Sequence, residues 1–458
     1  MDAVNFSSAV AELRQTFNSG HTRHLSWRRE QLRALKRALE VNEQKLLEAL
    51  HADLGKPEVE AYAGEIGFLM GEIDYTIKHL ASWAKPEKVK TPLVNAVGKS
   101  EVLREPLGVV LVIGPWNYPI QLVLAPLVGA IAAGNCAVLK PSELAPASSA
   151  AVAELVEQTL DPRAVKVVEG GVPETSALLA ERWDHVFFTG STRVGRIVYE
   201  AAAKHLTPVT LELGGKSPCV VDAELDLEPT ARRIVWGKFF NTGQTCVAPD
   251  YVLVHRDQEQ ALLNAMKATL REFYGADPKQ SPDYGRIVNS GHHQRLVAYL
   301  EGADVFVGGE HDADERYLAP TILRNVKPDD PVMQEEIFGP ILPVLVIDSV
   351  DEAISFINAR EKPLALYVFT SDKANAERVL QNTSSGGACV NDAISHLAVP
   401  ELPFGGVGES GMGAYHGSHS FETFSHRKSV LKRWTWPDVK LRYPPYADKL
   451  EVIKKVVG

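Results

Sequence analysis

The chain has 458 residues, of which 45% are hydrophobic and 23% are charged, and its formal net charge is −10. At roughly 150 residues per domain this length corresponds to about three domains, and the hydrophobic share excludes a disordered chain. The acidic balance gives no support to a nucleic-acid-binding or membrane-surface protein, since both functions favour a basic face. Cys136, Cys219, Cys246 and Cys389 form no C-x-x-C pair, so neither a disulfide framework nor a metal site is expected.

Targeting signals are not evident in the sequence. The first eight residues contain neither a basic region nor an apolar run, which argues against a secretory signal. Apolar residues dominate 106–139, but Pro, Gly and Asn interrupt every window long enough to span a bilayer. The C-terminus carries neither a CaaX box nor a hydrophobic tail. We therefore expect a cytoplasmic protein without a membrane anchor.

Hydrophobic periodicity predicts a helix first and an alternating pattern after it. Residues 26–52 carry a stripe of leucines at helical spacing, which we interpret as a packing face. From residue 102 onward, short apolar strands alternate with helical segments. Strands are predicted over 109–113, 137–139, 165–168, 185–188 and 207–213, and helices over 121–133, 147–159 and 194–204. A second alternating series runs from about 219 to 391. This alternation predicts βαβ units and parallel sheets covered by helices.

Two segments have the composition of phosphate-binding loops. Residues 406–411 satisfy G-x-G-x-x-G, but Pro403 does not suit the central strand that should precede such a loop. We interpret this segment as a glycine-rich loop near a site. Residues 187–195 are the better candidate, because an apolar strand runs into Thr-Gly-Ser-Thr and a helix that Ser191 or Thr192 can cap. An ordinary capped turn is the alternative for this segment.

Three residues at strand or loop ends have the chemistry of a catalytic site. Cys246 follows Gly243 and small polar residues, which favours an accessible backbone over a packed helix. Glu212 ends an apolar strand, where a carboxylate is costly unless it is paired or used. Asn117 lies in the turn after a strand, where α/β sheets line their ligand crevices. Together they supply a thiol, a carboxylate base and an amide donor, whereas the other cysteines lie among small apolar residues and indicate packing.

At these residues the sequence resembles the aldehyde dehydrogenase family over about residues 30–430. The matching segments are 115–117 (PWN), 140–143 (KPSE), 188–191 (FTGS), 211–215 (LELGG), 243–246 (GQTC), 335–340 (EEIFGP) and 403–406 (PFGG). The class 3 branch is the most similar, through 170–175 (GGVPET), 202–210 (AAKHLTPVT), 245–251 (TCVAPDY), 363–367 (PLALY) and 442–445 (RYPP). The basic, aromatic tail from residue 431 is interpreted as a packing arm or, less simply, as an interaction surface.

The resemblance implies a fold and its division into domains. It implies an α/β protein with a parallel-sheet cofactor domain over 1–83 and 104–211, and an α/β catalytic domain over 212–410. A bridging or oligomerisation element is expected from 84–103 together with a C-terminal arm over 411–458. By analogy with class 3, the protein is expected to form a homodimer.

The resemblance also implies a mechanism for oxidising an aldehyde to a carboxylic acid. Cys246 is expected to add to the aldehyde and form a thiohemiacetal, whose oxyanion accepts hydrogen bonds from the Asn117 amide and the Cys246 N–H. Hydride loss leaves a thioester, and Glu212 as general base activates the water that hydrolyses it. Tyr118 is expected beside the substrate tunnel, and the substrate is expected to be a medium-chain aliphatic or aromatic aldehyde.

The implied cofactor is NAD, with NADP left open. Lys140 and Glu143 are expected at the adenosine ribose, where Glu143 disfavours a 2′-phosphate and Lys140 accepts one. The predicted pyrophosphate contacts are Trp116, Gly190, Ser191, Thr192, Val194 and Gly195. Glu336 and Phe338 are expected at the nicotinamide ribose and ring.

Three other readings of the same residues stay open. A chain with this fold can end its reaction by acyl transfer to coenzyme A, although Glu212 favours hydrolysis. A thiol esterase using Cys246 and Glu212 would need no cofactor. The third is a non-catalytic protein on this fold. The presence of the thiol, the carboxylate base and the Asn117 amide together argues against it.

Overall fold

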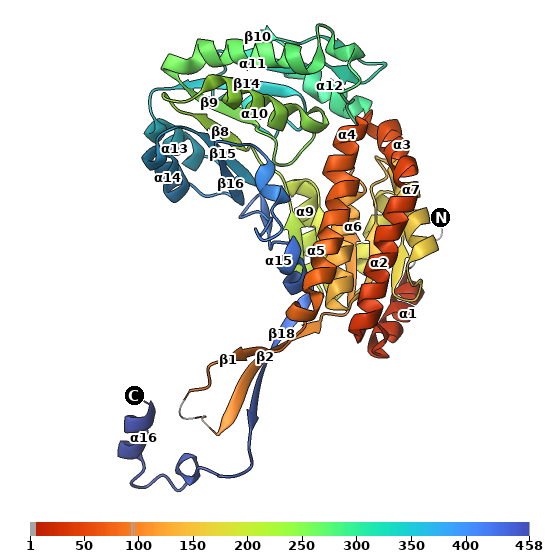
Figure 1. The fold of residues 1–458 in the computed structure, drawn as a ribbon, viewed down its shortest axis with the longest axis vertical. Helices are drawn as coiled ribbons and strands as arrows, with labels where there is room; N and C mark the ends of the chain where they lie inside the picture. The colour runs from red at the N-terminus through yellow and green to blue at the C-terminus, as the bar shows by residue number, and fades with distance from the viewer. Residues whose placement is uncertain (1–5, 93–94, 96, 458) are drawn as a thin grey trace.

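A computed structural model of the chain describes residues 6–92, 95 and 97–457, and Figure 1 shows two α/β lobes from which a long arm projects. The predicted fold class is confirmed, because each lobe is built on a mostly parallel sheet with helices packed against it. Among the described residues, no helix is both long and apolar enough to cross a bilayer.

The N-terminal helices pack beside the first lobe (Figure 1). Their bounds are α1 Ser7–Asn18, α2 Leu25–Val41, α3 Glu43–Leu54, α4 Glu58–Ala61 and α5 Gly67–Trp83, with a π-helical turn, Tyr62–Ile66, between α4 and α5. The helix predicted over 26–52 is divided in two at Asn42, whose φ and ψ of −100° and 12° leave the helical range and whose side-chain amide donates to the Ala38 carbonyl (2.9 Å). The leucine stripe is confirmed as a packing face, since Leu32, Leu35 and Leu39 are fully buried.

The first sheet has the strand order β17-β7-β6-β3-β4-β5, and all neighbours except β17 and β7 are parallel. Its strands are β3 Val109–Ile113, β4 Cys136–Lys140, β5 Val165–Val167, β6 His185–Thr189, β7 Val209–Glu212 and β17 Gly411–Met412, and its helices are α6 Gln121–Ala133, α7 Pro146–Thr159, α8 Val172–Ala180 and α9 Thr192–Ala203. The strands and helices predicted here are confirmed with ends shifted by one or two residues. Every residue of β3 is buried, as its unbroken apolar sequence requires.

The second sheet has the order β10-β13-β14-β9-β8-β15-β16, in which only β10 pairs antiparallel. Its strands are β8 Pro218–Val221, β9 Tyr251–His255, β10 Asp304–Val307, β13 Thr321–Arg324, β14 Ile341–Ile347, β15 Ala365–Phe369 and β16 Gly387–Val390. The helices of this lobe are α10 Leu227–Phe239, α11 Glu259–Tyr274, α12 Ser290–Ala298, α13 Val350–Asn358 and α14 Lys373–Asn382, and a small ribbon joins β11 His311–Asp312 to β12 Tyr317–Leu318. The second alternating series of the sequence is therefore confirmed.

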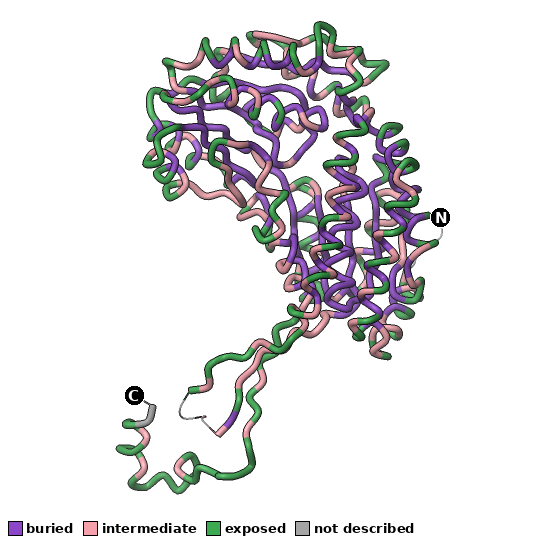
Figure 2. The backbone as a smooth tube through the Cα atoms, in the orientation of Figure 1, coloured by how far each residue is buried: buried purple, intermediate pink, exposed green. Residues whose placement is uncertain are grey.

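The arm consists of three antiparallel strands in the order β1-β2-β18, followed by the C-terminal helix. Their bounds are β1 Glu87–Val89, β2 Gly98–Pro106, β18 Ser425–Arg433 and α16 Leu450–Val457. Figure 2 shows that the arm is largely exposed, in contrast to the buried interiors of the lobes. Trp434 and Trp436 are 58% and 82% exposed, so the tail does not pack against its own lobes.

After β16, the last strand of the second lobe, the chain returns to the first lobe before it enters β18. Strand β17 pairs with β7, and α15, Gly417–Thr423, packs against α5 and α6. The predicted boundary at 103/104 lies inside β2 and the one at 211/212 lies inside β7, and the division into domains stays a prediction. The parallel strands β3, β4, β6 and β7 end at one edge of the sheet, and the candidate site lies there.

Candidate active site

The carboxyl edge of the first sheet collects the site residues that the sequence placed at strand ends. Glu212 is the last residue of β7 and Lys140 the last of β4, while Asn117 lies in the turn after β3 and Ser191 follows β6. The register brings these ends together, because Ile113 of β3 pairs with Lys140, and Glu212 pairs with the last residue of β6. Ligand crevices in open α/β sheets lie at this edge.

Cys246 is carried by a tightly turned loop that follows α10. Asn241, Thr242 and Gly243 have φ angles of 52°, 57° and 72°, in the left-handed region that is unfavourable for residues with a Cβ. At Gly243 a Cβ would lie 2.3 Å from the carbonyl oxygen of Gly339, so a side chain does not fit. Such strain is found where a loop must hold a functional group in place. The turn leaves Cys246 partly exposed.

Asn117 and Tyr118 are hydrogen-bonded to this loop. The Asn117 side-chain nitrogen donates to the Gln244 carbonyl (3.0 Å), and the Tyr118 hydroxyl shares a hydrogen bond with Thr245 Oγ1 (2.7 Å). An amide nitrogen carries two hydrogens, and the second has no acceptor among the described residues. The structure thus brings an amide donor and a tyrosine to the residues that immediately precede Cys246.

Glu212 lies close enough to Cys246 for its charge to affect the ionisation of the thiol. The Glu212 side chain is buried, neither of its oxygens has a hydrogen-bond partner in the described part of the chain, and burial raises its pKa well above the ordinary value. Burial also raises the pKa of the Cys246 thiol, and the carboxylates of Glu336 and Glu212 raise it further, whereas the N–H groups of Cys246 and Val247 lower it. A perturbed thiol beside an unpartnered carboxyl is typical of a catalytic site.

The segment after β6 fits the pyrophosphate of a dinucleotide. Ser191 caps α9, its Oγ accepting a hydrogen bond from the Val194 N–H (3.4 Å), and the hydroxyl of Thr189 is buried without a partner among the described residues. A Cβ at Gly195 would lie 2.7 Å from Leu213 Cδ2, so the first turn of α9 packs closely on the strand edge. The N–H groups of that turn favour an anion. Thr192 uses its hydroxyl elsewhere and donates to the Glu409 carbonyl (3.1 Å).

The other predicted cofactor residues flank this turn. Buried Lys140 donates to the Glu143 carboxylate (3.2 Å), whose side chain is 44% exposed. The Trp116 and Phe338 rings meet edge to face with centroids 5.3 Å apart. The Glu336 carboxyl packs against Gly214, because a Cβ at Gly214 would lie 2.0 Å from Glu336 Oε2. Burial raises the pKa of Glu336 to about 8. Buried ionisable groups, an anion-binding turn and an aromatic pair at one edge fit a dinucleotide.

The remaining motifs of the sequence also have a place. The glycine-rich segment 406–411 is a loop that leads into β17, where Gly411 pairs with Glu212. In the described chain no helix starts between residue 406 and α15, which begins at Gly417. It is therefore a loop beside the site and not a dinucleotide fingerprint, as predicted. Cys136 and Cys219 are fully buried, which agrees with packing. The Cys389 thiol is partly exposed and lies 3.2 Å from the Nδ1 atom of His396.

Sequence reasoning missed the buried groups behind Asn117. Lys56 and Glu65 form an ion pair of 2.5 Å with both side chains fully buried, and Lys56 Nζ also donates to the Asn117 carbonyl (3.0 Å). Glu60 accepts a hydrogen bond from the Asn241 N–H (2.8 Å), and burial raises its pKa to about 7. In the sequence these residues resemble the charged face of an exposed helix, so periodicity gives no signal for them.

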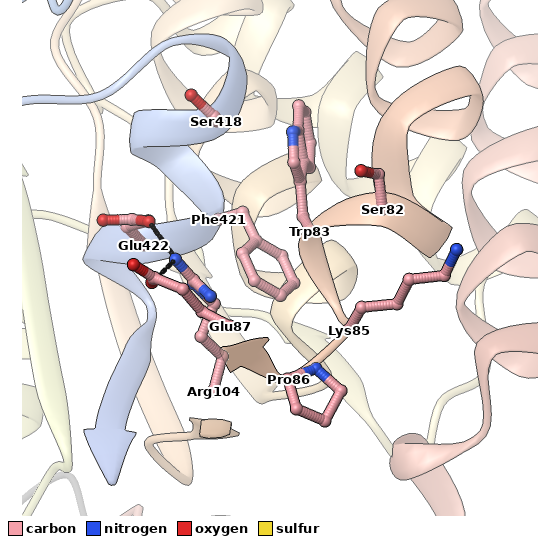
Figure 3. Close-up of a pocket in the computed structure, with 9 residues that line it drawn as sticks. All are labelled: Ser82, Trp83, Lys85, Pro86, Glu87, Arg104, Ser418, Phe421 and Glu422. Carbon is pink, nitrogen blue, oxygen red and sulfur yellow. Dashed lines mark hydrogen bonds and ion pairs between the residues drawn. The ribbon is translucent and has the colours of Figure 1, made fainter. Parts of the chain in front are cut away.

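A pocket lies away from this site, at the base of the arm (Figure 3). Its lining residues are Ser82, Trp83, Lys85, Pro86, Glu87, Arg104, Ser418, Phe421 and Glu422. Arg104 pairs with both Glu87 (2.9 Å) and Glu422 (3.0 Å). None of the predicted site residues lines it, and its charges compensate one another, so we assign it no chemistry.

Comparison with known proteins agrees with this site. The profile of the aldehyde dehydrogenase family matches residues 1–430. The chain is 52% identical over 448 residues to the Mus musculus protein named "Aldehyde dehydrogenase, dimeric NADP-preferring", covering 97% of this chain and 99% of that protein. It is 53% identical over 441 residues to Mus musculus "Aldehyde dehydrogenase family 3 member A2", covering 96% and 91%. A solved structure of Staphylococcus aureus AldH in a substrate-bound state superposes with a TM-score of 0.97 at 49% identity, covering 99% of both chains.

Proposed function

Because the chain belongs to the aldehyde dehydrogenase family and is an oxidoreductase, we propose that it oxidises an aldehyde to the carboxylic acid through a thioester on Cys246. The observation that carries this proposal is the buried, unpartnered carboxyl of Glu212 next to the Cys246 thiol. A thiol alone can form the covalent adduct, but a base that is not committed to other partners is needed to hydrolyse it.

We assign each step to one of the groups described above. The Cys246 thiolate adds to the aldehyde carbon, and the resulting oxyanion accepts hydrogen bonds from the uncommitted Asn117 N–H and the Cys246 backbone N–H. Loss of one such donor typically costs on the order of a hundred- to a thousand-fold in rate. Loss of hydride from the adduct carbon, for which the proposed cofactor would be the acceptor, would leave a thioester. Glu212 then takes a proton from water, which attacks the thioester and releases the acid and the Cys246 thiolate. Burial of Glu212 keeps its pKa high enough for this proton transfer.

We propose NAD(P) as the cofactor, held by the residues at the sheet edge. The first turn of α9, from Ser191, and Trp116 would bind the pyrophosphate, and Lys140 and Glu143 the adenosine ribose. Glu336 and Phe338 would bind the nicotinamide end. A bound nicotinamide supplies the hydride acceptor. The exposed Glu143 carboxylate favours NAD by charge, while one relative is named NADP-preferring, so both cofactors belong in the assay.

We propose a medium-chain aliphatic or aromatic aldehyde as the substrate. A cluster of aromatic rings supports an apolar tail. Phe404 stacks on His416 and meets Tyr415 edge to face, and Tyr415 lies close enough to Glu212 and Cys246 for their charges to affect its ionisation. A cytoplasmic location stays a prediction, which cell fractionation tests.

We propose a homodimer assembled through the arm. Strand β18 is the edge of the arm sheet and β16 the edge of the second sheet, and unpaired strand edges favour pairing with another chain. The exposed Trp434 and Trp436 supply apolar surface, and one relative is named dimeric. Sedimentation of the full chain should give the mass of two chains, and a single-chain mass at assay concentration contradicts the dimer.

The experiment is a panel of aliphatic and aromatic aldehydes followed by NADH and NADPH formation, for the wild type and Cys246→Ala. We expect oxidation by the wild type without coenzyme A, and a loss of at least about 10⁴-fold in the variant, as for the removal of other covalent nucleophiles. Substantial turnover by Cys246→Ala would contradict the assignment of Cys246 as the nucleophile. A requirement for coenzyme A favours acyl transfer, and ester hydrolysis without aldehyde oxidation favours an esterase.

A further inference from the structure

The Lys56–Glu65 ion pair is buried deep beside the candidate site. Lys56 lies between α3 and α4, and Glu65 lies in the π-helical turn Tyr62–Ile66. Both side chains are 0% exposed. Taking two charges out of water is so unfavourable that an apolar pair of similar volume is often at least as stable. Turns of the π type are often found at functional sites. Stability of the fold therefore does not account for the pair.

Glu65 holds the end of the turn that follows Asn117. Its Oε1 accepts from Lys56, and its Oε2 accepts from the backbone N–H groups of Ile120 (2.9 Å) and Gln121 (3.1 Å). These groups belong to the N-terminus of α6, whose own cap residue is the aliphatic Ile120. A carboxylate from another helix thus replaces the missing cap and meets the positive end of the helix dipole.

Lys56 holds the start of the same turn. Its Nζ donates to the Asn117 carbonyl (3.0 Å) and lies 4.2 Å from the centroid of the Tyr118 ring. The Asn117 carbonyl accepts a second hydrogen bond from the Asn241 side chain (2.9 Å), which joins it to the Cys246 loop. One ion pair therefore fixes both ends of residues 117–121.

We propose that the Lys56–Glu65 pair is a positioning device, which holds the Asn117 amide at the distance that the oxyanion on Cys246 requires. The inference rests on the proposed function, since it gives Asn117 its role. Oxyanion donors act at about 2.7–3.1 Å, and a displacement of about 1 Å can cost on the order of a hundred-fold in rate. Neither Lys56 nor Glu65 is proposed to contact the substrate.

The test is a cycle of variants measured by stopped-flow NADH formation from benzaldehyde and NAD in the full chain. Lys56→Met/Glu65→Gln removes both charges together at nearly constant volume, and it is made in the wild type and in Asn117→Ala. We expect about a 10- to 100-fold slower first turnover in the wild-type background and less than about a twofold change in Asn117→Ala, because a residue that acts through Asn117 has nothing left to position. The Kd for NAD should stay within about twofold in both backgrounds.

Each result supports or overturns the inference. An equal slowing in both backgrounds shows that the pair does not act through Asn117, and only this inference falls. If Asn117→Ala alone keeps the wild-type rate, the oxyanion role falls and this inference with it. If the double variant does not fold, Glu65→Gln in the same two backgrounds makes the same comparison, with an expected slowing of about tenfold that Asn117→Ala should abolish.

Arg28→Met is the matched control. Arg28 is also a buried cation that contacts α6, but it donates to the Ala132 carbonyl (3.0 Å) near the C-terminal end of the helix. We expect this variant to lower the melting temperature and to leave the rate of the first turnover within about twofold of the wild type. A slowing as large as that of the Lys56 and Glu65 variant would show that general loosening of α6 explains both, and would overturn the inference.

Discussion

Glu212 and Glu65 are both buried carboxyl groups, yet their surroundings are opposite. Glu65 is bonded to the Lys56 ammonium and to the Ile120 and Gln121 N–H groups. Glu212 has no partner for either oxygen in the described part of the chain, and burial raises its pKa well above the ordinary value. Hydrogen bonds and an ion pair therefore fix the Glu65 carboxylate, whereas the Glu212 carboxyl is positioned only by its place at the end of β7.

The difference fits the roles that we propose for the two groups. A general base must gain and lose a proton, and strong hydrogen bonds to its ionised form would lower its pKa and make that exchange unfavourable. A positioning group must keep one geometry, which needs several directional partners. In the proposed roles, the same residue type serves chemistry where it is unpartnered and geometry where it is paired. Substitution of each carboxylate by its amide separates these roles.

The largest effect is expected from Glu212→Gln. The amide cannot take a proton from water, so steady turnover should fall by about 10²- to 10⁴-fold, while the first turnover still releases one NADH per site. Stopped-flow traces distinguish this from Glu65→Gln, which should slow the first turnover itself. Unchanged steady turnover in Glu212→Gln excludes it as the required base.

The next effect is on the pH dependence of stability. Because the Glu212 pKa is raised in the folded state, the unfolded chain releases this proton first, and the folded state is progressively disfavoured above the ordinary value of about 4.5. The loss is up to roughly 1.4 kcal/mol per pH unit while the folded group stays protonated. Melting temperatures from pH 5 to 9 should therefore fall less steeply for Glu212→Gln than for the wild type.

Asn117→Ala is the control, because it removes no titrating group and should keep the wild-type slope. Parallel slopes for Glu212→Gln and the wild type would contradict the prediction.

The smallest effect is expected from Gly64→Ala, which disturbs the packing around Tyr118, beside the Lys56–Glu65 pair, without changing a charge. A Cβ at Gly64 would lie 3.2 Å from Tyr118 Cε1 and 3.3 Å from Phe240 Cε1, so both rings must shift by a few tenths of an ångström. We expect the first turnover to slow by about two- to fivefold.

Gly71→Ala is the matched control, because a Cβ at Gly71 meets nothing within 4 Å. It should add about 0.4–1 kcal/mol of stability and leave the rate unchanged. Equal rates in the two variants would show that the Tyr118 position is not limiting.

The sequence was sufficient for most of the fold because its strands and helices are strongly patterned. The run 109–113 is apolar throughout and forms the fully buried β3, and helix α6 occupies 121–133 as predicted. Prediction was weaker at a helix end that a single residue sets. The helix predicted over 26–52 is divided at Asn42, whose φ and ψ of −100° and 12° leave the helical range, and apolar periodicity contains no information on such a residue.

For the site, the sequence by itself determined which chemical groups are present, because Cys246, Glu212 and Asn117 stand at strand or loop ends in recognisable motifs. Only the tertiary structure decided which charges are paired. Glu65 resembles any acid on a helix surface, and its burial against Lys56 depends on how α4, α5 and α6 pack. Hydrogen bonding and desolvation act between residues far apart in the chain, so the environment of a carboxylate, unlike its identity, is fixed only when the chain is folded.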